Sequence, residues 1–217
     1  MSGALIDTDI LLKTASYQLL KQLLLTAPFG IESPAMIGAA QFVVTGKLKR
    51  KLKGDLEVAA KAHFLEAIQS IAAVEPTPSE LQLAAKLESA ALTLGVDLDI
   101  GESQLCALMY TRGIGLMMTG DKRAIKAIST LNHEDPCAYV HGKVACLEQL
   151  ILWMIDHAGI GAVQAPVCAV PAVDTSLTMA LGCNSGGSSE PSCREGLASY
   201  INNIKASAPD VLVPYPG

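Results

Sequence analysis

The sequence predicts an α/β fold: a three-layer α/β/α sandwich around a mostly parallel central sheet, followed by a C-terminal extension. Short apolar runs alternate along the chain with longer segments of helical spacing, which is the order found in layered α/β domains. Half of the 217 residues are hydrophobic, so a full core is easily built. A chain of this length suits one domain, with residues 1–157 as the α/β part and residues 158–217 as an extension packed on it.

The first elements are a strand, a helix and a second strand. Residues 4–10, ALIDTDI, form an apolar strand that ends in acidic residues, and the leucine spacing over residues 11–25 predicts a helix. Residues 29–34, FGIESP, are expected to be the second strand, closed by a proline. The following residues 35–48 are expected to be helical.

The middle of the chain is expected to be mostly helical. One helix should follow the basic segment KLKRKLKG and reach about Val74. The sequence Thr77-Pro-Ser-Glu80 has the form of a capping box with proline at the first helical position, so another helix should begin there. Gly95 is expected to end that helix as its C-cap.

A loop then enters a further helix near Gly101, and a buried strand at residues 114–120, IGLMMTG, leads into a helix at residues 121–130. A long helix is expected over about residues 143–157. Beyond Gly159, glycine and proline become frequent, and GCNSGGSSEPSC has the composition of a flexible loop. A last amphipathic helix is expected over about residues 192–207.

Charge and hydropathy exclude two broad classes of protein. The net charge of −5 argues against a protein that coats nucleic acid electrostatically, although it leaves room for a local basic groove. The longest apolar stretch is interrupted by Asp156 and His157, and no uncharged run approaches the roughly 20 residues of a membrane span. Without a basic leader segment, we expect a cytoplasmic protein with no membrane insertion.

The six cysteines have irregular spacings and form no CxxC motif. In a chain without a signal peptide, reduced thiols are the expected state. Cys106 lies in an apolar helical pattern and should be part of the core. Cys183 and Cys193 flank a Gly/Ser loop and could pair on oxidation, but we expect them to be reduced.

Three acidic residues stand where predicted strands end or helices begin: Asp7 after the first strand, Glu102 at the start of a helix and Asp121 after the strand LMMT. In an open parallel sheet, the carboxyl ends of the strands line the crevice where ligands bind. Carboxylates that converge there repel one another unless a cation compensates them. Hard oxygen ligands suit Mg²⁺ or Mn²⁺, which commonly serve phosphate chemistry.

Helix capping is the alternative explanation for each of these residues. Asp99-Ile-Gly-Glu102 has the form of a capping box, and Asp121 and Asp9 could be simple caps. Each residue alone is explained at least as well by capping. Three carboxylates at three strand–helix junctions are less easily explained in that way.

The segments LIDTDILLK and LDIGESQLCALMYTRGIGLMMTGDKRAIKAI carry a family resemblance. The first resembles the opening of PIN-domain nucleases, where a hydrophobic strand is followed by Asp-Thr and an apolar helix. The second resembles the later half of that family, where an acidic residue opens a helix and a strand then ends in Thr-x-Asp. Nineteen positions separate Glu102 from Asp121, as the pattern requires. The resemblance covers roughly residues 3–130.

The resemblance implies a compact α/β/α domain that cleaves single-stranded RNA with Mg²⁺ or Mn²⁺. Asp7, Glu102 and Asp121 would then be both catalytic residues and metal ligands. Thr119 would support them by a hydrogen bond to a carboxylate or a water. Asp9 stands where the family usually has a polar, uncharged residue, and is a secondary candidate ligand.

The sequence departs from the family pattern at one position. The family usually supplies another glutamate from the helix after the second strand, but the matching region here contains Ala39, Ala40 and Gln41. Gln41 could still bind water or substrate as a neutral group. The loss of one carboxylate implies either a site that works with one ion or a site that has lost catalysis.

Two basic groups are candidates for contacts with nucleic acid. One is the segment KLKRKLKG, with five basic residues in eight, and the other follows the proposed metal ligand Asp121. The alternative for both is a solvated surface, where cations near a helix C-terminus are favoured by the helix dipole. The candidate residues are Lys47, Lys49, Arg50, Lys51, Lys53, Lys122 and Arg123.

The sequence therefore predicts a Mg²⁺- or Mn²⁺-dependent ribonuclease. The first alternative is a catalytically silent PIN-like module that binds RNA or a protein partner, and the second is another α/β phosphohydrolase with a small substrate. The apolar helix near residues 147–154 could pack back on the sheet or form a homodimer surface. An antitoxin-like protein partner is compatible with the family but is not indicated by these residues.

Overall fold

The computed structural model of this chain describes residues 3–26 and 34–214, and within them it has an all-parallel sheet with the strand order β3-β2-β1-β4-β5. The predicted α/β class and mostly parallel sheet are confirmed. The strands are β1 (Ala4–Ile6), β2 (Ala35–Ile37), β3 (Ala72–Val74), β4 (Leu116–Thr119) and β5 (Val144–Cys146).

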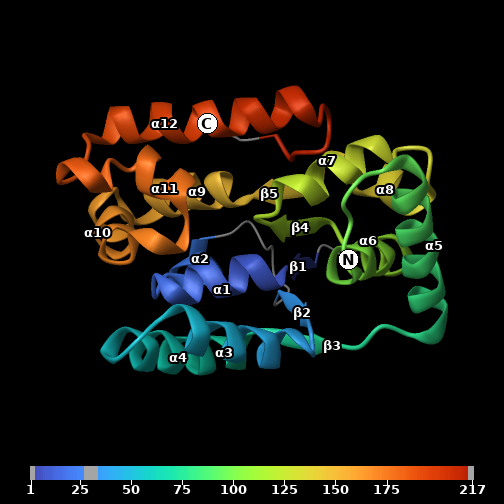
Figure 1. Cartoon of the computed structure of the whole chain (residues 1–217), viewed down its shortest axis with the longest axis horizontal. Coiled ribbons are helices and arrows are strands. Elements are labelled where there is room, and N and C mark those ends of the chain that lie inside the picture. Colours follow the sequence, from blue (N-terminus) through green and yellow to red (C-terminus); the bar gives the residue numbers. More distant parts are fainter. Residues whose placement is uncertain (1–2, 27–33, 215–217) are drawn as a thin grey trace.

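Helices cover both sides of the sheet. In Figure 1 the strands lie in the middle of the molecule, with α1 to α4 and α9 on the left and α5, α6 and α8 on the right. The helices are α1 (Thr8–Ser16), α2 (Leu20–Thr26), α3 (Ala40–Lys51), α4 (Asp55–Ala67), α5 (Pro78–Leu94), α6 (Ile100–Arg112), α7 (Lys122–Thr130), α8 (Asp135–Val140), α9 (Leu147–Ala158), α10 (Gly161–Ala169), α11 (Thr175–Ala180) and α12 (Glu190–Ser207). Short 3-10 turns are η1 (Ile68–Ser70), η2 (Pro171–Val173) and η3 (Cys183–Ser185).

The strand order reverses between β1 and β4. From β1 the chain builds outward through β2 to β3, and it then returns to place β4 on the other side of β1. The pairing is in register, with Leu5 opposite Met117 and Ile6 opposite Met118. In such doubly wound sheets the ligand crevice lies outside the carboxyl ends of the strands at this reversal.

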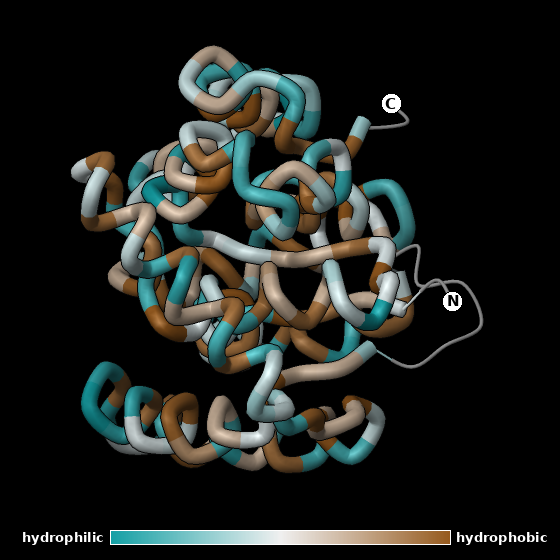
Figure 2. The backbone as a smooth tube through the Cα atoms, turned by 90° about the vertical axis from the view of Figure 1, so that its right-hand side faces the viewer, coloured by the Kyte–Doolittle hydropathy of each residue, from teal (hydrophilic) through white to brown (hydrophobic). Residues whose placement is uncertain are grey.

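The two central strands are buried on both faces, which explains their continuous apolar sequences. Leu5, Met117 and Met118 have no exposed surface. Figure 2 shows brown and teal stretches alternating along the helices, as expected for helices with one apolar side. Cys106 is buried, as predicted, and Trp153 is buried as well.

The predicted capping signals are confirmed. Thr77 and Glu80 form a reciprocal capping box at the start of α5, with Pro78 at the first helical position. Gly95 ends the helix in the left-handed region with φ of 65°. The predicted strand at Leu116–Thr119 and the helix after Asp121 are also present.

Three strands lie where helix was expected. β2 occupies Ala35–Ile37, in the segment predicted as helical, and most of the predicted strand FGIESP lies outside the described residues. β3 occupies the end of a predicted helix at Ala72–Val74, and β5 occupies the start of another at Val144–Cys146. Each has three residues, which is too short for a period to appear in the sequence.

The first strand and helix also differ in their boundary. The strand was expected to extend to residue 10, but it ends at Ile6, and α1 begins at Thr8. Because the strand is short, Asp7 stands at its carboxyl end and Asp9 is already in the first turn of the helix.

The C-terminal extension packs on the sheet domain and then returns to the edge of the sheet. α12 runs above α11 and α9 in Figure 1. The chain then forms a parallel bridge between Leu212 and Val144 of β5, and the Val213 N–H donates to the Val144 carbonyl at 2.8 Å. No helix of the described residues is both long and apolar enough to cross a membrane.

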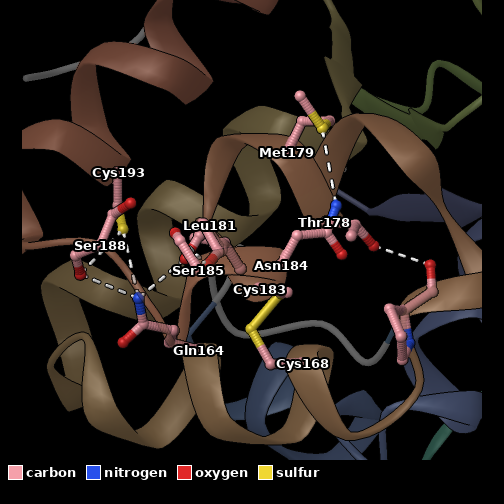
Figure 3. The surroundings of a disulfide bond; sticks show 12 residues. Gln164, Cys168, Thr178, Met179, Leu181, Cys183, Asn184, Ser185, Ser188 and Cys193 are labelled. Atoms are coloured by element: carbon pink, nitrogen blue, oxygen red, sulfur yellow. Dashed lines mark hydrogen bonds between the residues drawn. A yellow bond between two sulfur atoms is a disulfide. The ribbon is translucent and has the colours of Figure 1, made fainter.

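Cys168 and Cys183 form a disulfide, so the expectation of reduced cysteines is wrong for this pair. The bond joins α10 to the turn after α11 (Figure 3). Cys193, the partner considered for Cys183, is buried beside Gln164, whose side-chain amide donates to the carbonyls of Leu181 and Ser188. Sequence spacing did not reveal the pairing because the fold of the extension decides which thiols meet.

Candidate active site

Asp7 and Asp121 lie at the strand reversal, as the sequence predicts. Asp7 directly follows β1 and precedes α1, and Asp121 is the N-cap of α7 one residue after Gly120. The Asp7 N–H donates to the Met118 carbonyl at 2.9 Å, which joins the ends of β1 and β4. The two carboxylates therefore come from the neighbouring strands that form the crevice.

Asp7 is buried, and it forms no ion pair with any residue that the structure describes. Its side chain accepts a hydrogen bond of 3.0 Å from the Thr119 hydroxyl, and Thr119 itself is fully buried. Burial, and then the nearby charge of Asp9, raise the pKa of Asp7 to about 6. The Thr119 hydroxyl also accepts from the Asp121 N–H at 3.2 Å, so it connects two of the predicted site residues. The expected hydrogen bond from Thr119 to a carboxylate is present.

Glu102 is both a helix cap and a member of the acidic group. Its carboxylate accepts a hydrogen bond of 2.9 Å from the Asp99 N–H, and the Asp99 carboxylate accepts one from the Glu102 N–H. The predicted capping box is therefore present. Glu102 is only 4 % exposed. Burial is the main reason that its pKa is raised to about 8, and the charges of Asp99, Asp7 and Asp121 raise it further. Glu102 can therefore cap α6 and belong to the acidic group at the same time.

Asp121 already has a cation. Its carboxylate accepts from the Arg123 N–H at 2.8 Å, as an N-cap does, and also forms an ion pair of 2.8 Å with the Arg123 guanidinium. Burial alone would raise the pKa of Asp121, but the hydrogen bonds and charge of Arg123 outweigh it and hold the pKa below its usual value. Because the Arg123 side chain is 72 % exposed, this ion pair is readily exchanged with solvent.

Two open pockets meet at the Asp121–Arg123 pair. One has a volume of about 450 Å³ and is lined by apolar residues of α5, of the following loop and of α6, together with the charged residues Glu88, Asp97, Asp99, Glu102, Asp121 and Arg123. The other has a volume of about 330 Å³ and is lined by Asp9, Lys13, Gly120, Asp121, Lys122, Arg123, Asp174 and Ser176. Solvent and a charged ligand can therefore reach Asp121 from both sides.

The donor set suits a hard divalent cation, but it is not preassembled. Across residues 3–26 and 34–214, no three His, Cys, Asp or Glu side chains converge closely enough to hold a metal ion. Among these same residues, neither Asp7 nor Glu102 takes part in an ion pair. Two buried carboxylates with raised pKa values thus lack a positive partner, which is the charge that a divalent cation would supply.

Asp9 already has a cationic partner. It was a secondary candidate ligand, but its Oδ2 atom lies 2.7 Å from the Lys13 ammonium, which also lies 2.9 Å from Asp174 Oδ2. The Asp9–Lys13 spacing of four residues in one helix was visible in the sequence. Asp174 gave no such signal, because it reaches the site from the extension, more than 150 positions later.

Lys122 and Arg123, both predicted to contact nucleic acid, have different surroundings. The Lys122 ammonium pairs with the buried Glu148 carboxylate at 2.7 Å, donates to Ser176 at 3.2 Å and lies over the Tyr200 ring. It therefore connects α7 to the helices of the C-terminal part. Arg123 points into the pockets and is exposed.

The basic segment lies away from the carboxylates. Its residues occupy the C-terminal half of α3 and the loop to α4, whereas Gln41 is in the first turn of α3, next to the carboxyl end of β2. A helix of this length separates its two ends by about 18 Å. Lys49, Arg50, Lys51 and Lys53 are exposed and Lys47 is half-buried. The structure therefore does not bring them into the carboxylate group.

Comparisons with protein-family models, with curated proteins and with solved structures gave no match for this chain.

Proposed function

We propose that this chain is a Mg²⁺- or Mn²⁺-dependent ribonuclease of the PIN type, which hydrolyses phosphodiester bonds of single-stranded RNA. One observation carries the proposal: Asp7 and Glu102 are buried beside the strand reversal, and neither has a cationic partner in the described chain. Buried carboxylates that serve only stability are normally paired. An unpaired couple next to an open pocket is typical of a site that receives its cation from outside.

Asp7 and Glu102 would hold the ion, and Asp121 would complete the group when Arg123 releases one of its oxygens. A divalent cation at that position supplies a water nucleophile at neutral pH and compensates the charge that develops on phosphate. Thr119 orients Asp7 through its hydroxyl and fixes the backbone of Asp121 at the same time.

Arg123 would exchange one anionic partner for another. Its guanidinium now rests on Asp121 and is mostly exposed, so movement to a substrate phosphate costs little packing. The planar guanidinium suits bidentate contact with phosphate oxygens. The Arg123 guanidinium would then neutralise the substrate phosphate, and the Asp121 carboxylate would be free to bind the cation.

A silent RNA-binding or protein-binding module is the second candidate. The observation in its favour is the Asp121–Arg123 ion pair, which neutralises one carboxylate of the three without any added ion. The absence of an acidic residue among Ala39, Ala40 and Gln41 favours it as well.

Calorimetric titration of Mn²⁺ separates the two candidates. The wild type should bind Mn²⁺ saturably, and Asp7→Asn and Asp121→Asn should each weaken binding at least about tenfold while circular dichroism stays unchanged. The exposed Asp55→Asn on α4 is the matched control and should bind as the wild type does. The same proteins are then tested for cleavage of single-stranded RNA. Equal heats in all variants, or no heat in any, would favour the silent module.

A further inference from the structure

A further pocket lies between the basic segment and the C-terminal extension. Its volume of about 450 Å³ falls within the range of about 300–1,000 Å³ that is typical of small-molecule sites. On the left of Figure 1, α10 lies above α3 and α4, and the pocket is at this junction. One wall is the loop from α3 to α4, and the other is formed by residues 169–173. The lining shares no residue with the two pockets at Asp121.

The wall from the basic segment is held in place by the end of α3. Leu52 is the C-cap of this helix and is 4 % exposed, and its N–H donates to the Leu48 carbonyl at 2.9 Å. Gly54 then turns the chain into α4 with a φ of 59°, a conformation that favours glycine. The packing of Leu52 and this short connection fix the positions of Lys51, Lys53 and Leu56 around the pocket.

The wall from the extension is also fixed. It directly follows Cys168, whose disulfide with Cys183 joins the end of α10 to the turn after α11 (Figure 3). The Thr178 hydroxyl donates to the Pro171 carbonyl at 2.7 Å, which ties the wall to α11. Because both walls are in place before any ligand arrives, little ordering of the protein opposes binding.

The lining is aliphatic apart from two ammonium groups. Its apolar members are leucine, alanine, valine and proline, and Leu56 leaves 42 % of its surface exposed here. Among the described residues that line the pocket, none is aromatic, so no ring is offered for a nucleobase to stack on. The basic segment was predicted to contact nucleic acid, but this lining suits an aliphatic chain better.

The two ammonium groups belong to Lys51 and Lys53, which are exposed. Within the part of the chain that the structure describes, neither lysine takes part in an ion pair. Two unpaired cations at an aliphatic pocket are complementary to a ligand that carries a negative charge at one end of an apolar body.

We propose that this pocket binds a small molecule with a single aliphatic chain and an anionic head group, of the kind of a medium-chain carboxylate. The chain lies against Leu52, Leu56 and residues 169–173, and the head group is neutralised by Lys51 and Lys53. The inference does not depend on the proposed function, because none of the carboxylates of the candidate active site lines this pocket.

Calorimetric titration of decanoate, below the concentration at which it forms micelles, tests the site. We expect saturable binding of one decanoate per chain. Hexanoate should bind at least about tenfold more weakly, because each buried methylene contributes about fourfold to affinity. Decylammonium has the same chain with the opposite charge and should give no saturable binding. Absence of decanoate binding, equal affinity for hexanoate, or equal affinity for decylammonium would each overturn the proposal.

A pair of double variants tests the position of the head group. Lys51→Gln/Lys53→Gln should weaken decanoate binding at least about tenfold, as expected for lost hydrogen bonds to a charged group. Lys49→Gln/Arg50→Gln removes the same charge from exposed neighbours outside the lining. It should stay within about threefold of the wild type, because exposed charges outside the pocket are screened. Equal losses in both variants would reduce the effect to general attraction and overturn the proposal.

A second pair of variants tests the position of the chain. Leu56→Ala should weaken decanoate binding at least about threefold, because part of the apolar wall is lost. Leu81→Ala is the matched control, since Leu81 is 44 % exposed, about as much as Leu56, and lies on α5. It should bind as the wild type does, and equal losses in the two variants would contradict the assigned pocket.

Vesicles distinguish a free ligand from a membrane surface. The wild type should bind monomeric decanoate without sedimenting with vesicles of anionic phospholipid. Sedimentation with vesicles in the absence of decanoate binding would assign the same residues to a lipid surface and overturn the small-molecule site.

Discussion

Glu80 and Glu102 occupy the same position in their helices but differ in their tertiary contacts. Each is the third residue of its helix, each closes a capping box, and each is 4 % exposed. Glu80 also contacts the Arg112 guanidinium at 2.8 Å and accepts from the Thr111 hydroxyl at 2.7 Å. Glu102 has acidic neighbours instead, namely Asp99, Asp7 and Asp121.

The electrostatic result is opposite at the two sites. The hydrogen bonds from Arg112 hold the pKa of Glu80 far below its usual range, whereas burial among acidic residues raises the pKa of Glu102 to about 8. Glu80 therefore completes a structural junction between α5 and α6. Glu102 is a capping residue that forms no ion pair within the described chain, and this difference makes it a candidate site residue.

The largest expected effect is on stability at the satisfied site. Glu80→Gln removes the negative partner of Arg112 and should lower the free energy of unfolding by about 3 kcal/mol, in the range for a broken buried ion pair. Urea denaturation at pH 7 measures it, with the exposed Glu195→Gln as the control. A loss below about 1 kcal/mol would mean that the Arg112 pair contributes little and that the contrast with Glu102 is weak.

Substitutions of Glu80 and Glu102 should differ in their effect on the stabilisation of the protein by Mn²⁺. Mn²⁺ at one hundred times its dissociation constant should stabilise the wild type by about 2.7 kcal/mol, as mass action requires. Glu80→Gln should keep this gain relative to its own metal-free form, and Glu102→Gln should lose it. Thermal unfolding with and without Mn²⁺ measures both. A gain that survives in Glu102→Gln would remove this residue from the site.

The third effect is a pH dependence in the metal-free protein. The folded pKa values of Asp7 and Glu102 lie above the usual carboxylate values, so the folded state binds more protons than the unfolded state between about pH 4 and 8. Their stabilising contribution is therefore greatest at low pH and is lost as the pH rises through 6 and 8. One pKa unit corresponds to about 1.4 kcal/mol.

The comparison protein for this effect is the double variant Asp7→Asn/Glu102→Gln. The stability of the wild type relative to that variant should fall by at least about 2 kcal/mol between pH 5 and 8, because both shifted carboxyl groups lose their protons in this range. Taking the difference cancels other groups that titrate in this range, such as His63, whose pKa is lowered chiefly by burial. A difference that stays constant or rises with pH would contradict the unpaired state of the two carboxylates.

The smallest effect concerns the two caps themselves. Thr77→Ala removes the cap of α5 and should cost about 1 kcal/mol. Asp99→Ala removes the equivalent cap of α6 but also a negative charge beside Glu102 and Asp7, so its cost at pH 8 should be about half as large. Urea titration of both variants at pH 8 gives the comparison, and equal costs would show that the charge of Asp99 is screened.

The parts of the fold that the sequence predicted are those with strong local signals. The capping residues Thr77 and Asp99, the left-handed Gly95 and the apolar run into Thr119 each act through neighbours in the chain. The strands β2, β3 and β5 were missed because three buried residues cannot display a period, and because only pairing with adjacent strands makes them strands.

The residues of the candidate site were predicted from the sequence, but their long-range contacts were not. Asp7, Glu102 and Asp121 were identified from their order at strand–helix junctions. The long-range ion pairs around the site were not identified. Arg112 reaches Glu80 across 32 positions, and Asp174 reaches Lys13 from the extension. The pairing of Cys168 with Cys183 was missed for the same reason.

The amino-acid sequence by itself determined the α/β class, the helix boundaries set by caps and the placement of acidic residues at strand ends. These depend on backbone conformation and on contacts within one turn, which adjacent residues control. Only the tertiary structure decided which carboxylates have a cation and which do not. Electrostatic partners are chosen by distance in space and by burial, and both arise only when distant segments pack together.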